Sequence, residues 1–420
     1  MDKFVIRGGR KLSGTIPIGG AKNATLALMP AALLAGGTYR LTNTPLLRDV
    51  NTMAALLRSM GVTTDLQDHV LTLDTARVAH FEAPYEHVKK MRASIYVLGP
   101  LVARYGRARV SLPGGCAWGP RPVNLHLEGI RKLGAEVELS GGYIVARAER
   151  LRGARIHFDV SSVGATGNVL MAAVLARGAT VVQNAAIEPE ITALARFLTS
   201  MGARIQGIGT NRLEIEGVDE LHPADAETIP DRIEAGTFLL AAAITHGSIT
   251  LTNVNPDHLT AVITKLEDAG CVLTTTPTTV TIATPDGLRG VDVTAAIYPG
   301  FPTDMQAQWT ALMAVAGGTS VVTDSIYLDR FKHVPEMLRL GADIELKENS
   351  AIVRGVPRLT GAKVMSTDLR ASASLILAGL VAEGVTEVLR VYHIDRGYES
   401  VERKLRGVGA DIERVSGEEF

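Results

Sequence analysis

Cysteine and aromatic residues are scarce in this chain. Among its 420 residues there are two cysteines, and aromatic residues make up 5%. Two cysteines exclude a disulfide framework. With so few aromatic rings, the hydrophobic core must consist mainly of Ala, Leu, Val and Ile. Glycine, by contrast, is frequent, with 42 residues, and this indicates many tight turns.

An excess of one charge and long apolar runs are also missing. The 43 basic and 44 acidic residues give a net charge of −1, whereas non-specific nucleic-acid binding usually requires a basic excess. The first residues contain no apolar segment of a secretory signal. Apolar stretches such as 26–35 are shorter than the roughly 20 residues that span a bilayer. We therefore expect a cytoplasmic protein with no nucleic-acid partner and no membrane insertion.

Two sets of glycines recur along the chain with a period of about 70 residues, which indicates an internal repeat. Each glycine of the first set follows an apolar helix, and each of the second set follows an amphipathic helix. The first set is Gly37, Gly106, Gly178, Gly247, Gly318 and Gly384, and the second is Gly61, Gly134, Gly202, Gly270, Gly341 and Gly409.

Each repeat is predicted to contain an inner helix, a strand, a loop, an outer helix and a strand, with one further strand before the next repeat. Helices that are apolar on nearly every face, such as 237–246, are expected to be buried. The prediction is an α/β fold of two bodies, each with three repeats around its inner helices. The segment 217–232, rich in proline and acidic residues, is predicted to link them, and a cleft between the bodies is the expected ligand site.

Charged residues recur where the inner helices are predicted to begin. Lys22, Arg92, Asp304 and Arg370 all lie 14 or 15 residues before a glycine of the first set. Helix N-termini attract anions, so a Lys or Arg there costs free energy unless an anion compensates.

A second level of charge lies in the loops before the outer helices and includes Arg48, Arg121 and Arg396. We favour an anion site that contains Lys22, Arg92, Arg121 and Arg396. For most of the acidic residues at these positions, solvated loop ends or salt bridges between repeats remain the alternative.

The second repeat carries an insertion at 113–122, PGGCAWGPRP, which contains Cys116. A cysteine near cations has a lowered pKa and can act as a nucleophile or general acid. Cys271 serves as a comparison, because it occupies a position that is Val or Ala in the other repeats, which predicts an inert core thiol. The chain has no dinucleotide-binding glycine motif and no zinc motif, so no cofactor and no metal are expected.

Five segments together resemble a known family. They are GGAKNATLALMPAALLAGG (19–37), SLPGGCAWGPRPVNLHLEGIRKLGA (111–135), GFPTDMQAQWTALMAVA (300–316), TDLRASASLILAGLVAEG (367–384) and YHIDRGYE (392–399). With them, the chain resembles the UDP-N-acetylglucosamine 1-carboxyvinyltransferases, a family of enolpyruvyl transferases, over essentially its whole length.

The resemblance implies transfer of the enolpyruvyl group of phosphoenolpyruvate to the 3′-hydroxyl of UDP-N-acetylglucosamine, with release of phosphate, in the first committed step of peptidoglycan synthesis. It implies two inside-out α/β domains of three repeats each, with an active site in the cleft between them. The domains would be 22–230, with the catalytic loop 113–122, and 1–21 plus 231–420.

The resemblance also assigns roles to individual residues. The catalytic residues would be Cys116 as proton donor, Asp304 as candidate general base, Lys22 and Arg396. Phosphoenolpyruvate would be bound by Lys22, Asn23, Arg121 and Arg396. UDP-N-acetylglucosamine would be bound by Asn23, Arg92, Arg121, Pro122, Val123, Asn124, Leu125, Ser162, Val163, Gly164, Asp304 and Ile326. Supporting polar residues would be Arg48, Asp49, Glu188, Asp231, Arg330, Asp368 and Arg370. Cys116 would also be the target of the epoxide antibiotic fosfomycin.

Two alternatives stay open at this point. The first is 5-enolpyruvylshikimate-3-phosphate synthase, which shares the fold and the donor but lacks the loop cysteine and the RPVNLH segment. The second is a non-catalytic repeat protein that binds a nucleotide sugar. Assays of phosphate release separate the alternatives, and the sequence leaves the oligomeric state open.

Overall fold

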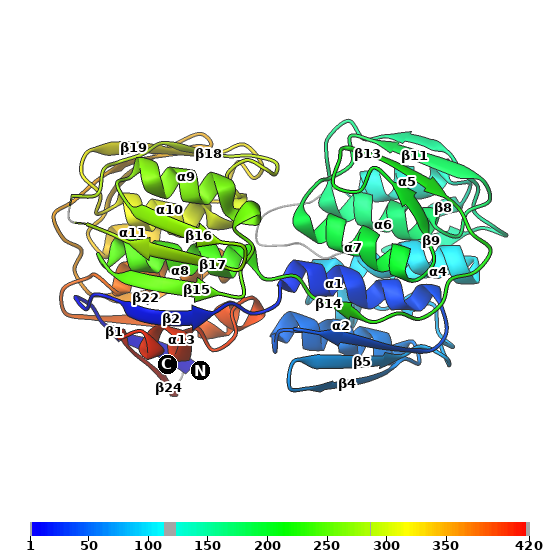
Figure 1. The fold of residues 1–420 in the computed structure, drawn as a ribbon, viewed down its shortest axis with the longest axis horizontal. Coiled ribbons are helices and arrows are strands. Elements are labelled where there is room, and N and C mark those ends of the chain that lie inside the picture. Colours follow the sequence, from blue (N-terminus) through cyan, green and yellow to red (C-terminus); the bar gives the residue numbers. More distant parts are fainter. Residues whose placement is uncertain (1, 113–122, 286, 417–420) are drawn as a thin grey trace. The chain divides into compact units, whose positions relative to one another are not determined.

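The computed structural model of this chain describes residues 2–112, 123–285 and 287–416 (Figure 1). The chain forms two compact units. One is Gly20–Ile229, called here the 20–229 unit, and the other combines Met1–Gly19 with Pro230–Phe420 and is called the two-segment unit. The chain therefore passes from one unit to the other after residues 19 and 229, whereas the resemblance predicted these boundaries after residues 21 and 230. Each unit is described by itself.

The described residues of the 20–229 unit form three four-stranded sheets. In spatial order, the first consists of β14 (Ala226–Glu227), β3 (Thr38–Thr42), β5 (Val70–Asp74) and β4 (Thr63–Gln67). The second consists of β6 (Glu82–Ala83), β7 (Arg107–Ser111), β9 (Tyr143–Arg147) and β8 (Glu136–Ser140), and the third of β10 (Arg155–His157), β11 (Ala179–Gln183), β13 (Arg212–Glu216) and β12 (Arg204–Gln206).

In the two-segment unit the residues that the structure describes also form three four-stranded sheets. The first consists of β22 (Lys363–Met365), β23 (Val385–Leu389), β1 (Asp2–Arg7) and β24 (Asp411–Ser416). The second consists of β2 (Ser13–Pro17), β15 (Ser248–Thr252), β17 (Thr279–Ala283) and β16 (Val272–Thr276), and the third of β18 (Val293–Ala295), β19 (Thr319–Asp324), β21 (Ser350–Arg354) and β20 (Asp343–Lys347).

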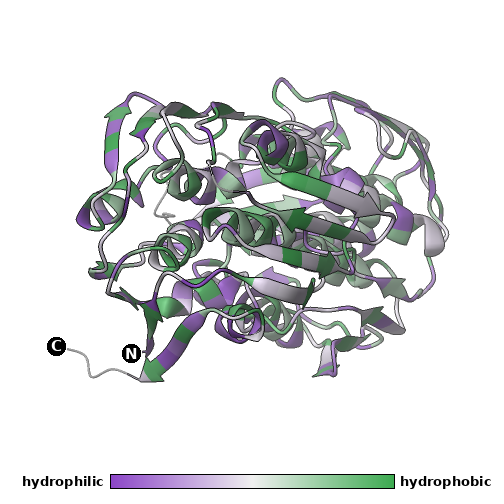
Figure 2. Ribbon diagram, turned by 60° about the vertical axis from the view of Figure 1, so that its left-hand side comes forward, coloured by the Kyte–Doolittle hydropathy of each residue, from purple (hydrophilic) through white to green (hydrophobic). Residues whose placement is uncertain are grey.

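All six sheets have the same pairing pattern. The first two strands in each order given above run parallel, as in β14 with β3, and the remaining pairs are antiparallel. The strands alternate polar and apolar residues, visible as bands in Figure 2, because one face of each sheet covers helices. The sixfold repeat predicted from the glycines is confirmed by this shared topology.

Each unit encloses three inner helical segments. In the 20–229 unit they are α1 (Lys22–Ala31) with the 3-10 turn η1 (Ala32–Leu34), η2 (Arg92–Val97) with α4 (Leu98–Tyr105), and α6 (Val163–Ala173). In the two-segment unit they are α8 (Arg232–Ile244), η4 (Thr303–Met305) with α10 (Gln306–Met313), and α12 (Leu369–Gly379). Every residue of α10 and of 233–244 in α8 is buried, as the apolar pattern predicted.

The remaining helices are mostly the outer, amphipathic ones. They are α2 (Arg48–Ser59), α5 (Asn124–Lys132) and α7 (Pro189–Ser200) in the 20–229 unit, which also has the short α3 (Tyr85–Val88). In the two-segment unit they are η3 (Pro256–Leu259) with α9 (Thr260–Asp268), α11 (Val334–Arg339) and α13 (Val401–Gly407), and η5 (Val391–Arg396) precedes α13.

The structure corrects the predicted strand count and the predicted linker. Each sheet has four strands where the repeat pattern predicted three, because parallel edge strands such as β6 and β14 are two residues long and show no periodicity. The predicted linker 217–232 in fact contains β14, which pairs with β3. The N–H of Ala21 also donates to the carbonyl of Ile229, so residues 217–229 of this segment belong to the 20–229 unit.

The N-terminal segment completes two sheets of the two-segment unit. Strand β1 lies between β23 and β24, and β2 pairs in parallel with β15. In Figure 1 both strands are drawn in blue beside elements of much later sequence. The resemblance implied this arrangement, whereas the residues of 1–18 alone allowed pairing with either body.

Gly247 departs from the other glycines of its set. The other five have positive φ, but at this position the left-handed residue is His246, with φ 50°. Gly247 is required for a different reason, since a Cβ there would lie 2.4 Å from the carbonyl oxygen of Leu12. The Gly therefore allows β2 and its neighbours to approach the end of α8.

Three asparagines at strand ends make the same kind of hydrogen bond, which the sequence analysis did not predict. Each has positive φ, which Asn tolerates better than most residues, and each donates its side-chain amide to a carbonyl on the neighbouring edge segment. The asparagines are Asn43, Asn184 and Asn253, and the carbonyls belong to Thr228, Phe158 and Ile18, at 2.7–2.8 Å.

We predict that Gly61→Ala destabilises the protein more than Gly134→Ala. Both glycines belong to the second set and have similar φ, 100° and 92°, so both substitutions incur the left-handed strain of about 1–2 kcal/mol. Only at Gly61 would the new Cβ meet backbone, the carbonyl oxygen of Arg77 at 2.5 Å. Denaturant unfolding of the two variants checks this, and equal midpoints would contradict it.

Candidate active site

Several inner helices begin at a capping side chain. The carboxylate of Asp231 accepts the N–H groups of Ile233 and Glu234 at 2.8 and 3.0 Å. Asp368 caps α12 in the same way, and the Ser162 hydroxyl accepts an N–H at the start of α6. A cap satisfies donors that the helix leaves open, and a carboxylate also suits the positive end of the helix dipole.

Asp304 lies between two arginines of the two-segment unit. Its Oδ1 is 2.8 Å from Arg330 Nη2 and its Oδ2 is 2.5 Å from Arg370 Nη2. Both arginine side chains are at least 92% buried, with 8% and 7% exposed, whereas that of Asp304 is 24% exposed. Two close guanidinium groups favour the ionised carboxylate, and its exposed part leaves room for a further hydrogen-bond partner.

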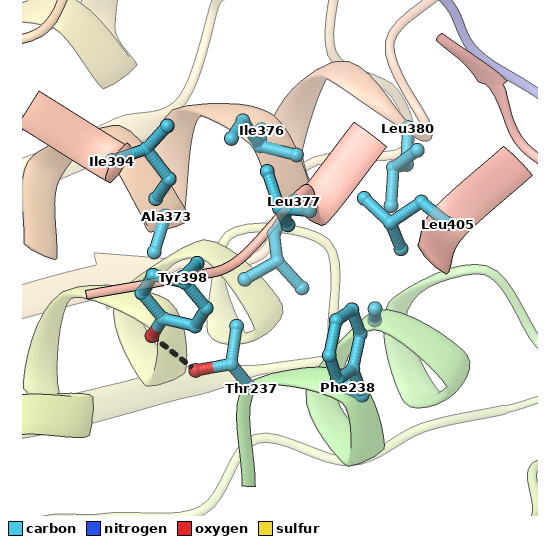
Figure 3. A pocket seen from close by; sticks show the side chains of 11 residues that line it. Thr237, Phe238, Ala373, Ile376, Leu377, Leu380, Ile394, Tyr398 and Leu405 are labelled. Carbon is cyan, nitrogen blue, oxygen red and sulfur yellow. Dashed lines mark hydrogen bonds between the residues drawn. The ribbon is translucent and has the colours of Figure 1, made fainter. Parts of the chain in front are cut away.

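Arg370 has a hydroxyl group as a hydrogen-bond partner, that of Tyr398, which in turn pairs with the hydroxyl of Thr237 (Figure 3). Its Nη1 donates to the Tyr398 hydroxyl at 3.3 Å, which lies 2.7 Å from the Thr237 hydroxyl. The single proton of Thr237 is donated to the carbonyl of Ile233, so Tyr398 must donate to Thr237 and accept from Arg370. The figure shows this pair at the polar end of an otherwise apolar cavity, with Leu377 and Phe238 beside it.

The charge states in this cluster follow from burial and from its partners. Burial alone would lower the pKa of Arg370, but the carboxylate of Asp304, with Tyr398 and Asp231, raises it above its usual value. Burial raises the pKa of Tyr398, so this hydroxyl stays neutral near pH 7. The result is a charged Arg370 whose position is set by a neutral hydroxyl on one side and by Asp304 on the other.

Lys22 begins α1 in the 20–229 unit, as predicted. Its Nζ lies 3.7 Å from Oδ2 of Asp49, in the first turn of α2, and the side chains are 14% and 5% exposed. The ammonium group stands at the positive end of a helix dipole, where a cation is unfavourable. Asp49 offsets part of this cost, and a bound anion would offset more.

A buried histidine lies against the N-terminal turn of α6. His126 Nδ1 is 2.8 Å from the side-chain amide nitrogen of Asn168, whose oxygen accepts the N–H of Gly99. The amide therefore donates to His126, and the neutral ring carries its proton on Nε2. Burial, with Arg92 nearby, lowers the pKa of His126 to about 3. A Cβ at Gly164 would lie 3.0 Å from Nε2, so Gly is needed for this contact.

The other predicted residues lie mostly at the starts of helices. Asn23 is in the first turn of α1, Arg92 begins η2, Val123 precedes α5, Asn124 and Leu125 begin α5, and Val163 and Gly164 begin α6. Arg48 begins α2, Glu188 precedes α7, Ile326 follows β19 and Arg396 ends η5. Cys116, Arg121 and Pro122 lie outside the described residues.

The structure brings two predicted groups into contact within single units. Asp304, Arg330 and Arg370 meet in the two-segment unit, and Lys22 meets Asp49 in the 20–229 unit. The buried partners that fix these groups were missed, among them Thr237, Thr303, Asp324 and Tyr398. In the sequence these residues are visible only as polar residues near apolar segments. A polar residue in such a place does not show which other residue it contacts.

Neither a metal-ligating cluster nor a helix that could cross a membrane is present in the described part of the chain. Within 2–112, 123–285 and 287–416 no three His, Cys, Asp or Glu side chains are placed to hold a metal ion. Among the helices of the same residues, none is long and apolar enough to cross a membrane.

Comparison with solved structures shows the fold. The enolpyruvyl transferase NikO from Streptomyces tendae superposes with a TM-score of 0.90 over 99% of both chains, at 27% identity. EPSP synthase from Acinetobacter baumannii gives a TM-score of 0.76 over 99% of this chain and 100% of that chain, at 20% identity. The family model described as EPSP synthase (3-phosphoshikimate 1-carboxyvinyltransferase) matches residues 6–405. The chain is thus an enolpyruvyl transferase by fold and by family.

Relatives of higher sequence identity show to which group of enolpyruvyl transferases this chain belongs. A UDP-N-acetylglucosamine 1-carboxyvinyltransferase from Chloroherpeton thalassium is 60% identical over 100% of this chain and 99% of its own length. One from Chlorobium chlorochromatii is 58% identical over the whole of both chains. This chain belongs to the UDP-N-acetylglucosamine 1-carboxyvinyltransferase family, a family of transferase enzymes, as the sequence motifs indicated.

We predict that His126 makes the protein less stable as the pH falls from 7 to 5. The unfolded chain protonates this ring below its ordinary pKa of 6.5, whereas the folded chain does so only near 3, so stability is lost as the pH falls between these values. The loss by pH 5 is about 2 kcal/mol. Denaturant unfolding of wild type and His126→Gln at both pH values measures it, and parallel pH curves would contradict the prediction.

We predict that Tyr398→Phe lowers the free energy of unfolding by about 1–3 kcal/mol, because Arg370 Nη1 loses a buried acceptor. Tyr39→Phe is a matched control, since the Tyr39 hydroxyl has neutral hydrogen-bond partners, the carbonyl of Ala35 and the Thr75 side chain, and about 1 kcal/mol should be lost. Chemical denaturation measures both. A cost for Tyr398→Phe no greater than for Tyr39→Phe would contradict the role given to the Tyr398 hydroxyl.

Proposed function

We propose that this enzyme transfers the enolpyruvyl group of phosphoenolpyruvate to the 3′-hydroxyl of UDP-N-acetylglucosamine and releases phosphate. The observation that carries the proposal is full-length identity of 56–60% with relatives that bear the name of this reaction. The product feeds peptidoglycan synthesis, so the proposal includes a role in cell-wall formation, cell shape and division. We place the enzyme in the cytoplasm, where its two substrates are made.

The donor carries a phosphate and a carboxylate, and the proposal pairs these anions with Lys22, Arg121 and Arg396 with help from Asn23. Support comes from the position of Lys22, a nearly buried cation at a helix N-terminus, which gains from an anion beyond what Asp49 supplies. Departing phosphate gains negative charge, and fixed cations stabilise that charge in the transition state.

The acceptor carries a diphosphate, for which helix N-termini are suitable partners. The proposal assigns its binding to the start of α6 with Ser162, Val163 and Gly164, to the start of α5 with Asn124 and Leu125, and to Arg92, Arg121, Pro122 and Val123. Ile326 would contact the uracil ring. Support comes from the position of these residues at the N-terminus of α6, because the first N–H groups of a helix lack intrahelical carbonyl partners.

The reaction is proposed to proceed by addition and then elimination. Cys116 gives a proton to C3 of phosphoenolpyruvate while the acceptor 3′-oxygen bonds to C2 and its proton passes to Asp304. In the elimination the acid and the base exchange roles: a proton passes from C3 to the Cys116 thiolate and phosphate leaves C2, which restores the double bond. Arg330 and Arg370 fix the orientation of the Asp304 carboxylate.

The sister reaction is the second candidate, because the matching family model carries the name of 3-phosphoshikimate 1-carboxyvinyltransferase. We predict phosphate release from phosphoenolpyruvate with UDP-N-acetylglucosamine and none with shikimate 3-phosphate. Steady-state phosphate release with each acceptor in turn measures this. If only shikimate 3-phosphate supported phosphate release, the protein would catalyse the sister reaction. If neither acceptor did, the remaining alternative would be a non-catalytic protein that binds a nucleotide sugar.

Cysteine variants provide the matched control for the proposed acid. Cys116→Ser should lower the rate by at least about tenfold, within the usual range for loss of a general acid. Cys271→Ser should keep the wild-type rate, because Cys271 is a buried thiol next to Thr284. Fosfomycin should add its mass to wild type and Cys271→Ser but not to Cys116→Ser. Equal effects of the two substitutions would remove Cys116 from the mechanism.

A further inference from the structure

One fully buried carboxylate in the two-segment unit connects a loop to the Asp304 cluster. Asp324, at the end of β19, has no exposed surface. Its Oδ1 accepts the backbone N–H groups of Ile326 and Tyr327 at 2.9 and 2.8 Å. Its Oδ2 accepts the hydroxyl of Thr303 at 2.6 Å. The loop after β19 is therefore attached through Asp324 to the residue that precedes Asp304.

The direction of each hydrogen bond in this connection is determined. An ionised carboxylate is only an acceptor, so the single proton of Thr303 goes to Asp324. The Thr303 oxygen then accepts from Arg330 Nη1 at 2.9 Å. The other nitrogen of this guanidinium, Nη2, lies 2.8 Å from Asp304 Oδ1. One hydroxyl thus sets the orientation of the guanidinium that pairs with Asp304.

The loop itself also restrains Arg330. Its guanidinium carbon lies 5.3 Å from the centre of the Tyr327 ring, within the range of a cation–π contact. Loop and guanidinium therefore form a closed set of contacts: Asp324 holds the loop N–H groups, Tyr327 contacts Arg330, and Arg330 contacts Thr303 and Asp304. A displacement of this loop would move Arg330 and with it the partner of the Asp304 carboxylate.

We propose that Thr303 is a positioning residue, whose hydroxyl couples the loop that carries Ile326 to the carboxylate of Asp304. The inference rests on the proposed function, in which Ile326 contacts the uracil ring and Asp304 takes the proton of the 3′-hydroxyl. The nucleotide end of the acceptor then helps to orient the base at its sugar end, so that acceptors without a seated nucleotide react slowly.

The test compares three threonine variants in steady-state phosphate release with phosphoenolpyruvate and UDP-N-acetylglucosamine. Thr303→Val removes the hydroxyl at nearly constant shape, and kcat should fall about tenfold or more while KM for phosphoenolpyruvate changes less than threefold. Thr303→Ser keeps the hydroxyl and should retain kcat within about threefold. Thr323→Val is the matched control. Thr323 lies on β19 next to Asp324, but its hydroxyl pairs with that of Ser350, so the substitution should leave kcat within about twofold.

Several outcomes would overturn the proposal. A kcat for Thr303→Val equal to that of Thr323→Val would show that the hydroxyl does not act on Asp304. An equal loss in Thr303→Ser and Thr303→Val would show that shape, and not the hydroxyl, matters. Should Thr303→Val fail to fold, Asp324→Asn gives the same answer, since its amide nitrogen forces the Thr303 proton away and kcat should again fall about tenfold. An unchanged kcat in Asp324→Asn would overturn the coupling.

The wild-type rate separates this inference from the function on which it rests. Wild type that releases phosphate with UDP-N-acetylglucosamine establishes the proposed function whatever the variants do, and the variants then decide the role of Thr303. Wild type that releases none with this acceptor overturns both proposals.

Discussion

Burial of helices that are apolar on nearly all sides is the constraint on which the rest of this structure depends. Each unit encloses three such segments, and helices like α8 and α10 have hardly any residue exposed. Most charged side chains in these segments lie in their N-terminal turns, where backbone N–H groups lack intrahelical carbonyl partners and the helix dipole is positive. The arrangement that forms the core therefore also gathers charge and open donors at the starts of the helices.

The polar side chains at these starts are held by partners from the same repeat and, for Asp304, also from another repeat. Asp304 at the start of one inner segment meets Arg370 at the start of another, and Arg330 comes from the loop after β19. Lys22 meets Asp49 across two helices. Buried ion pairs give little net stability, because desolvation offsets most of their attraction.

The sequence was sufficient to predict the repeat, the buried inner helices and the starting positions of Lys22, Arg92 and Arg370. These features depend on local patterns, such as a glycine after a helix or an apolar run of helical length. The edge strands β6 and β14 were missed because two residues carry no period. Thr303 and Asp324 were missed because their role depends on a hydrogen bond between residues 21 positions apart in the chain. A single sequence without an alignment does not show such contacts.

Hydrogen–deuterium exchange with and without UDP-N-acetylglucosamine tests the central claim most directly, which is that substrate binds at the N-terminal turns of the inner helices. Amides in these turns lack intrahelical partners, so a bound ligand should slow their exchange. The account predicts protection in the peptides that cover 162–165 and 303–306, with no change in the hairpin turns 67–70 and 347–350. Protection confined to the hairpin turns, or none at the helix starts, would contradict the account.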